Sequence, residues 1–309
     1  MAAVRANNWR MTSELSAAAR RLAAALEPFA GQVYFSPEAH AEYVALGFQP
    51  SPGEFGTGVH LPDGPAYFTS RGSVMGQVPG ELIAAAFAVF NPEAVVPAVA
   101  FGWTLTDAPT ICAARDRGAI AQLERILGAN PDGIDIVGDL LERAASPLRP
   151  EGRPLYAGLL SQQIPSSPIG RAWRYADRLR EFRGDAHTAA WTSAGFDATE
   201  IGLLTELYWG MAMGTYVRTR AWSDSQLEAA KERLRARGVL DGDEFSATGY
   251  ETRDAVERAT DVQMRPAIDA LGHDLATVCD ILEGWGAEIR AQGGYLPGGP
   301  HELANAARR

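Results

Sequence analysis

The stretch Val239-Leu240-Asp241-Gly242-Asp243-Glu244-Phe245-Ser246-Ala247 decides the fold of this chain. Two short segments with apolar residues flank an Asp-Gly pair, which is a strong signal for a tight β-hairpin. The helical pattern before the hairpin starts with a capping box at Ser223 and Gln226 and ends at Gly238. Another long helical pattern follows from Thr248 to Leu271. A helix, a small hairpin and a long helix in this order predict a winged helix-turn-helix.

Helix signals dominate the rest of the sequence. Apolar residues from Leu15 to Leu26 follow a helical period that we expect to end before Pro28, and Ser36-Pro37-Glu38 is a typical helix start. Strand signals are confined to the hairpin above and to the Gly/Pro-rich stretch 49–64, where a second hairpin could lead into residues 66–69. We therefore predict a mostly α protein with more than half of its residues in helices.

The chain divides at a cluster of prolines. Three prolines and Gly152 fall between Ser146 and Pro154, which is the composition of a linker. We expect an N-terminal helical, winged-helix-like domain over residues 1–150 and a C-terminal winged-helix domain with long C-terminal helices over residues 151–309. Arg71 and Trp103 in the first half echo Arg183 and Trp222 in the second, as in a duplicated chain.

Composition limits the classes of protein. The 309 residues are 46% hydrophobic and 21% charged, which excludes a disordered chain. The net charge of −10 does not favour a nucleic-acid-binding protein, because such proteins normally carry a basic surface. Cys112 and Cys279 form no Cys-x-x-Cys pair, and arginines interrupt the apolar N-terminus. We expect a cytoplasmic protein without disulfides, a signal peptide or a membrane span.

Residues 197–272 resemble the winged helix of MarR-type regulators, with the helix end at Arg233-Leu234-Arg235-Ala236-Arg237 and the turn at Thr248-Gly249. Residues 30–275 are more specifically similar to the SalK-like helix-turn-helix family of actinobacteria. The matching pieces are Tyr34-Phe35-Ser36-Pro37-Glu38, Phe90-Asn91-Pro92-Glu93, Arg183-Gly184-Asp185-Ala186-His187, and Thr260-Asp261 with Pro266 and Leu271-Gly272. The resemblance implies two winged-helix-like halves, and DNA binding only by analogy.

The charges on the predicted DNA-reading elements suit DNA poorly. The hairpin tip carries Asp241, Asp243 and Glu244, which would face the phosphate backbone. The preceding helix holds four cations interleaved with acids, so contacts such as Glu228 with Lys231 and Glu232 with Arg235 are expected on a solvated face. The alternative is that the helix contacts DNA through Arg233, Arg235 and Arg237.

The best candidate for chemistry is Arg183-Gly184-Asp185-Ala186-His187. Gly184 is expected to end one helix and Asp185 to cap the next, which would place His187 in the first turn. The positive end of the helix dipole would keep the imidazole neutral, as suits an acid/base group or a haem or metal ligand. The alternative is structural: a capped helix in which His187 packs against Trp191 and Arg183 pairs with an acid.

Other motifs give weaker evidence for a functional site. His40 and His60 form no metal-binding spacing, and the sequence has no nucleophile-elbow or nucleotide-loop pattern in a suitable context. Asp261, four residues before Arg265, could orient an arginine in a pocket, although an exposed ion pair is the simpler interpretation. We therefore predict no metal site from spacing, and whether His187 holds a haem or a metal stays open.

Aromatic residues supply the last clue. Trp209 lies beside Met211, Met213 and two glycines, a composition typical of an adaptable wall for a flat apolar ligand. We predict a small-molecule site between the halves, with Arg71, Trp103, Trp191, Trp209 and Trp222 as ligand-binding residues and Arg183, Asp185 and His187 as catalytic candidates.

The expected protein is thus an enzyme of specialised metabolism or a drug-sequestering resistance protein, without a specific nucleic-acid or membrane partner. A homodimer remains open. The alternative function is a ligand-responsive, DNA-binding transcriptional regulator.

Overall fold

The computed structural model describes residues 2–55 and 58–297. The first half of the chain forms α1 (Ala2–Gly31), η1 (Gln32–Phe35), α2 (Pro37–Ala45), β1 (Glu54–Phe55), β2 (Val59–His60), α3 (Gly64–Gly72), η2 (Ser73–Met75), α4 (Gly80–Phe87), α5 (Pro92–Leu105), α6 (Ala108–Leu127) and α7 (Ile134–Ala145). Helices make up 72% of the structure, which confirms the predicted fold class.

The second half continues this helical architecture around one more hairpin. It forms α8 (Pro154–Leu160), α9 (Pro168–Ser193), α10 (Ala198–Tyr208), η3 (Val217–Arg220), α11 (Asp224–Ala236), β3 (Leu240–Asp241), β4 (Glu244–Phe245), α12 (Ala247–Gln263), α13 (Arg265–Leu271), η4 (Gly272–Asp274) and α14 (Leu275–Ala291). None of the described helices combines the length and apolarity needed to cross a membrane.

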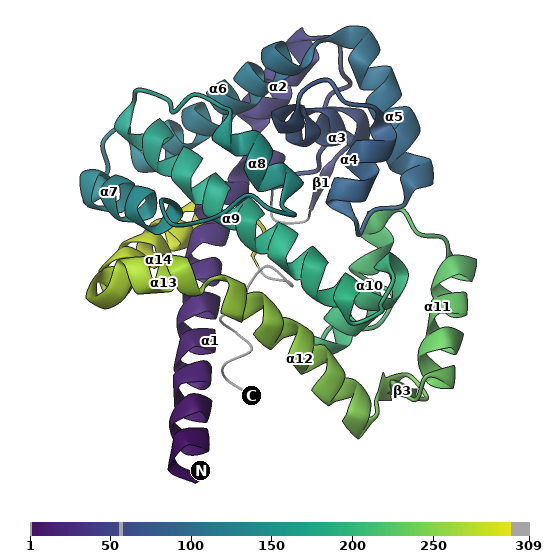
Figure 1. The fold of residues 1–309 in the computed structure, drawn as a ribbon. Coiled ribbons are helices and arrows are strands. Elements are labelled where there is room, and N and C mark those ends of the chain that lie inside the picture. The colour runs from purple at the N-terminus through teal and green to yellow at the C-terminus, as the bar shows by residue number, and fades with distance from the viewer. Residues whose placement is uncertain (1, 56–57, 298–309) are drawn as a thin grey trace.

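The long helix α9 crosses the middle of the molecule and organises it (Figure 1). Helices α1, α7, α13 and α14 gather at one end, and α3, α4 and α5 lie beyond the opposite side of α9. Helices α10, α11 and α12 with the hairpin β3–β4 form a separate corner. The largest hydrophobic core includes Leu22, Trp173 and Ile289, so it takes residues from both sides of position 150. The two-domain division stays a prediction.

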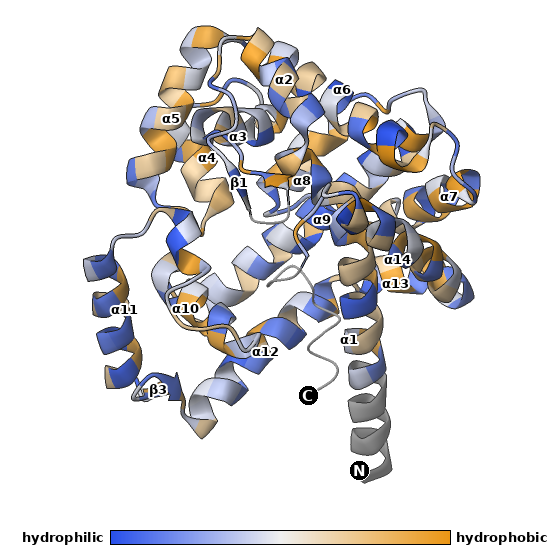
Figure 2. Cartoon of the chain, turned by 180° about the vertical axis from the view of Figure 1, so that it is seen from behind, coloured by the Kyte–Doolittle hydropathy of each residue, from blue (hydrophilic) through white to orange (hydrophobic). Residues whose placement is uncertain are grey.

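The predicted hairpin and its flanking helices are confirmed. Leu240 pairs with Phe245 and Asp241 with Glu244 in antiparallel register. Both halves of the capping box at Ser223 and Gln226 are present at the start of α11. Figure 2 shows α11 mainly in the hydrophilic colour, which fits a helix that buries a narrow face at the edge of the molecule.

The structure corrects two expectations near the N-terminus. Helix α1 does not stop before Pro28 but continues to Gly31, and Pro28 packs against Gly286 of α14. Packing therefore outweighs the local cost of a proline near a helix end. Residues 66–69 are not a strand: Asp63 caps α3, and the second hairpin closes earlier, through Glu54–Phe55 and Val59–His60.

A third correction concerns Gly184. Helix α9 runs without interruption from Pro168 to Ser193. No helix therefore ends at Gly184, and Asp185 does not cap the start of a new one. The neighbours Phe182 and Ala186 are buried in the interior, and this burial holds the helix together through the glycine.

Candidate functional site

A cavity of about 970 Å³ lies between α3, α4, α9, α10 and α12. This volume is at the upper end of the range for sites that bind small molecules. Residues of α1, of η1, of the stretch 52–62, of the segment between α10 and α11 and of the stretch 295–297 also line it. The cavity takes residues from both sides of position 150.

Four aromatic rings form one wall of the cavity. Tyr67 and Phe68 belong to α3, Phe87 ends α4, and Phe90 follows it. The rings of Phe68 and Phe90 meet edge to face with centroids 5.1 Å apart, and those of Tyr67 and Phe87 are 6.3 Å apart. Such a wall suits a flat apolar ligand, because aromatic rings favour edge-to-face and offset contacts.

Helix α9 supplies a further wall of the cavity. Arg180, Gly184, His187 and Trp191 recur at intervals of four, three and four residues and line the cavity along one helix face. A Cβ atom at Gly184 would meet only the Glu181 carboxylate, 3.7 Å away. The missing side chain at this position therefore adds space to the cavity.

Asp185 belongs to the cavity lining and makes a contact that the sequence did not reveal. Its Oδ2 accepts a hydrogen bond of 3.0 Å from the Tyr156 backbone N–H, in the first turn of α8. The carboxylate thus caps a neighbouring helix, α8. Burial raises the pKa of Asp185 to about 7, and the Tyr156 N–H only partly opposes this rise. Near neutral pH the group can donate or accept a proton.

His187 is neutral, but for a different reason from the one predicted. It lies in the interior of α9, where burial lowers its pKa to about 4. Its Nδ1 is 3.0 Å from Thr260 Oγ1, and that hydroxyl donates its proton to the Val256 carbonyl at 2.9 Å. Thr260 must therefore accept from His187 Nδ1–H. This tautomer leaves a lone pair on Nε2, which has no hydrogen-bond partner among the described residues.

Arg183 is fixed by acids on α12. Its Nη2 donates to Glu257 Oε1 at 2.7 Å and to Asp261 Oδ1 at 2.9 Å. Asp261 also accepts from Arg20, so the arginines that it orients are Arg183 and Arg20 and not Arg265. Arg253 Nη1 donates to the other oxygen of Glu257 at 2.9 Å. The ion-pair alternative for Arg183 is thus present, although the residue also lines the cavity.

Arg71, on α3, lines the same cavity. Its Nε and Nη2 donate to the two oxygens of Glu181 at 3.0 and 2.8 Å, a bidentate pair. Burial alone would raise the pKa of Glu181, but the charges of Arg71 and Arg180 outweigh it and lower the pKa to about 2. The guanidinium of Arg71 also lies 4.4 Å from the Phe87 ring centroid. The structure therefore brings Arg71 and Arg183 into one cavity.

The predicted tryptophans fall into two groups. Trp191 and Trp209 line the cavity. Trp103 and Trp222 are not among its lining residues; each instead ties backbone segments together through its indole N–H. Trp103 donates to the Val78 carbonyl at 2.8 Å and Trp222 to the Val89 carbonyl at 2.9 Å. The structure thus places Trp103 and Trp222 in scaffold contacts.

Sequence reasoning missed several charged residues of the lining, namely Glu27, Arg180, Glu181, Arg220, Arg253 and Glu257. Most of them pair with residues far away in the chain, as Arg71 does with Glu181, so no local spacing marks them. Arg220 lies in a polar run, Val217 to Arg220, that resembles an exposed turn.

The cationic side chains on and just after α11 form ion pairs with acidic side chains. Arg233 pairs with Asp197 at 2.6 Å and with Glu200 at 3.2 Å, and Arg237 pairs with Glu200 at 2.9 Å. The expected contacts of Lys231 with Glu228 at 2.7 Å and of Arg235 with Glu232 at 2.6 Å are confirmed. Arg235 additionally meets Asp243 at the hairpin tip at 2.5 Å.

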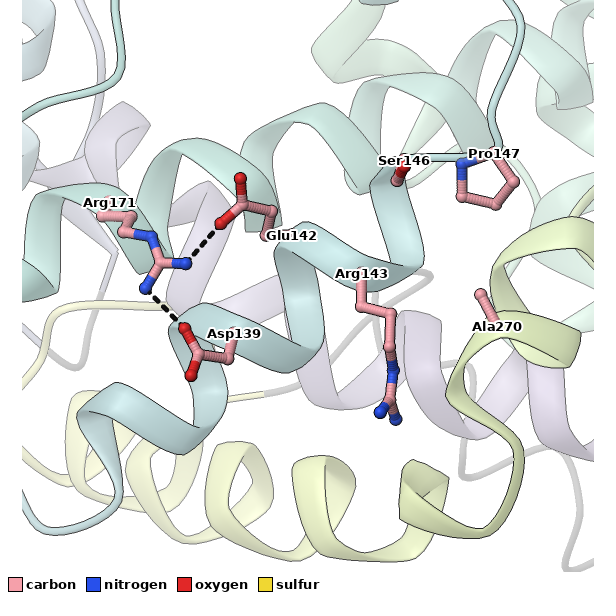
Figure 3. A pocket seen from close by; sticks show the side chains of 7 residues that line it. All are labelled: Asp139, Glu142, Arg143, Ser146, Pro147, Arg171 and Ala270. Carbon is pink, nitrogen blue, oxygen red and sulfur yellow. Dashed lines mark hydrogen bonds and ion pairs between the residues drawn. The ribbon is translucent and has the colours of Figure 1, made fainter.

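A second hollow lies on the surface beside α7 (Figure 3). Its arginines are paired with acids: Arg171 Nη1 lies 2.8 Å from Asp139 and its Nη2 meets Glu142, while Arg143 lies 2.5 Å from Asp274. This open, ion-paired surface lacks the buried aromatic walls of the main cavity. In the part of the chain that the structure describes, no group of three or more His, Cys, Asp or Glu side chains is placed to hold a metal ion.

Residues 19–297 match the model of a helix-turn-helix family. The chain belongs to this helix-turn-helix family. The match covers both walls of the cavity as well as the unit formed by α10, α11, the hairpin and α12. Neither a curated protein nor a solved structure matches the chain at a significant level.

Proposed function

We propose that this helix-turn-helix protein binds an apolar small molecule in the cavity between α3, α4, α9, α10 and α12. The observation that carries the proposal is a cavity of about 970 Å³ that is lined by a cluster of aromatic rings together with buried charged and polar groups. Arg71, Arg183, Asp185 and His187 would form its polar end, and Trp191 and Trp209 would contact the ligand. The protein would either convert this ligand or sequester it, as the resemblance to the SalK-like family leaves open.

The polar end can recognise a ligand through complementary groups. His187 offers an unprotonated Nε2, and Asp185, with its pKa near 7, offers a carboxyl group that gains or loses a proton close to neutral pH. A buried group whose surroundings shift its pKa suits acid/base work on a bound molecule, and this holds for each of the two separately. They serve equally to hold a hydroxyl or a carbonyl group of a ligand that is only stored.

The test uses the space beside Gly184. Gly184→Leu would extend a side chain into the cavity, while Gly284→Leu is the matched control: Gly284 is exposed on α14, and nothing lies within 4 Å of an added Cβ. The probe is N-phenyl-1-naphthylamine, an uncharged dye that fluoresces in apolar surroundings.

We expect saturable dye binding by the native protein and by Gly284→Leu, and at least about tenfold weaker binding by Gly184→Leu. Equal dye affinity of all three proteins would show that the dye binds elsewhere. Failure of the native protein to bind the dye saturably would refute the proposed function.

A second candidate function is a ligand-responsive transcriptional regulator, which the family match favours. The ion pairs of Arg233, Arg235 and Arg237 count against it, because cations that contact phosphate must be released from their acids. We expect affinity for the DNA upstream of its own gene to be no tighter than about 10⁻⁴ to 10⁻⁶ M at physiological salt. A nanomolar, sequence-selective gel shift would favour the regulator.

A further inference from the structure

The charges that line the cavity do not balance. In the described part of the chain, five arginines and four carboxylates line it: Arg71, Arg180, Arg183, Arg220 and Arg253 against Glu27, Glu181, Asp185 and Glu257. Asp185 is only partly ionised at neutral pH, because burial raises its pKa to about 7. The lining thus carries a net positive charge, which an apolar ligand without a charge would leave uncompensated.

Among the lining residues that the structure describes, Arg220 is the one arginine without an acidic partner. The other four lining arginines lie within 3.0 Å of a carboxylate oxygen. No Asp or Glu among the described residues forms an ion pair with Arg220, and its Nε is buried without a hydrogen-bond partner. Its guanidinium carbon lies 4.5 Å from the Phe90 ring centroid and 4.3 Å from that of Tyr216, and its Nη2 donates to the Tyr216 hydroxyl.

The surroundings make this unpaired charge costly. Burial lowers the pKa of Arg220 to about 10, and the charges of Arg71 and Arg180 also lower it, whereas Tyr67 and Tyr295 oppose this fall. An anion beside Arg220 would relieve both effects, since it replaces lost hydration and offsets the neighbouring cations.

The backbone holds Arg220 in place before any ligand arrives. The Arg220 carbonyl accepts from the Asn91 backbone N–H at 2.9 Å, and the next carbonyl, that of Ala221, accepts from Asn91 Nδ2 at 3.0 Å. Trp222 Nε1 adds a third bond to the Val89 carbonyl. These bonds fix the backbone at Arg220, and the contact of Nη2 with the Tyr216 hydroxyl restrains its side chain, so the residue loses less freedom when it binds an anion.

We propose that Arg220 is the counter-ion for an acidic ligand, and that the ligand class is an aromatic carboxylate whose ring system packs on Tyr67, Phe68, Phe87 and Phe90. Arg220 lies against Phe90, so a carboxylate on Arg220 and a ring on the aromatic wall fit one molecule. Planar carboxylates are also the groups that a guanidinium binds through two parallel hydrogen bonds. This inference rests on the proposed function and specifies its ligand.

The test compares 2-naphthoate with 2-naphthamide, which has the same ring and no charge, by calorimetric titration at pH 8. The native protein should bind the carboxylate about 10 to 100 times more tightly than the amide. Arg220→Gln should abolish this preference, and Arg220→Lys should retain part of it. Arg218→Gln is the matched control, because Arg218 lies on the same short helix but is exposed and paired with Asp224.

The outcomes separate this inference from the proposed function. A native protein that binds the neutral dye and both naphthyl probes without preferring the carboxylate would overturn the inference and leave the proposed function intact. A preference that persists in Arg220→Gln would also overturn it, provided that circular dichroism shows the variant to be folded. Absence of binding by the dye and both probes up to ~1 mM would overturn both proposals.

Discussion

Asp185 provides the sharpest test of the polar end of the cavity, because its environment makes stability depend on pH. A rise in pKa from 3.8 to about 7 means that the folded state holds this proton more tightly than the unfolded state does. The stability contributed by the protonated carboxyl is complete below about pH 4 and is lost as the pH rises to about 7. Asp185→Asn removes this dependence, and its amide oxygen can still accept from the Tyr156 N–H.

The size of the effect follows from the two pKa values. At ~1.4 kcal/mol per pKa unit, ionised Asp185 costs the folded protein about 4 kcal/mol at pH 8, but only 1–2 kcal/mol at pH 5. We therefore expect Asp185→Asn to gain about 3 kcal/mol more stability relative to the native protein at pH 8 than at pH 5. Urea denaturation at both pH values measures the difference. If Asp185→Asn and the native protein differ in free energy of unfolding by the same amount at pH 5 and at pH 8, the reasoning is refuted.

Three further predictions concern individual residues. His187 should stay neutral down to about pH 5 and carry its proton on Nδ1. Nitrogen NMR should show this tautomer, with Thr260→Val as the control. Titration of His187 near pH 6.5 would contradict the prediction. Gly184→Ala should stabilise the protein by about 0.5–1 kcal/mol in urea denaturation, because the glycine lies inside a helix with room for a methyl group; a loss of stability would contradict this. Trp222→Phe should cost about 1 kcal/mol by losing its bond to Val89 while dye affinity changes less than about twofold, whereas a large loss of affinity would return Trp222 to the ligand site.

Local signals in the sequence predicted the local structure well. The Asp-Gly pair at Asp241 marks a real hairpin, and the capping residues Ser36 and Ser223 start helices as expected. These features depend on residues within one turn of each other. The same local reasoning failed at Gly184, because burial of the neighbouring residues on α9 outweighs the preference of a single glycine.

The cavity was predictable only in part. Arg71, Arg183, Asp185, His187, Trp191 and Trp209 were selected from the sequence and all line it. Their partners were not predictable: Glu181 joins Arg71 across 110 positions, and Glu257 joins Arg183 across 74. Asp185 shows the limit most clearly, since its capping partner lies on α8, earlier in the chain, and no pattern around Asp185 indicates it.

The cavity borders the unit formed by α10, α11, the hairpin and α12, and this position gives a way to separate storage of a ligand from regulation by it. Ile201, Gly202 and Thr205 of α10 and Arg253 and Glu257 of α12 contact the cavity, so a ligand could alter the unit that would face DNA.

A regulator requires that ligand and DNA change each other's affinity by the same factor, typically 5 to 150-fold. Arg233 and Arg237, however, form ion pairs with Asp197 and Glu200 at the start of α10, and neither acid lines the cavity. We therefore expect saturating 2-naphthoate to leave the affinity for DNA within about twofold at fixed salt. Fluorescence anisotropy of a labelled duplex measures this, and a reciprocal change of fivefold or more would identify a ligand-responsive regulator in place of a sequestering protein or an enzyme.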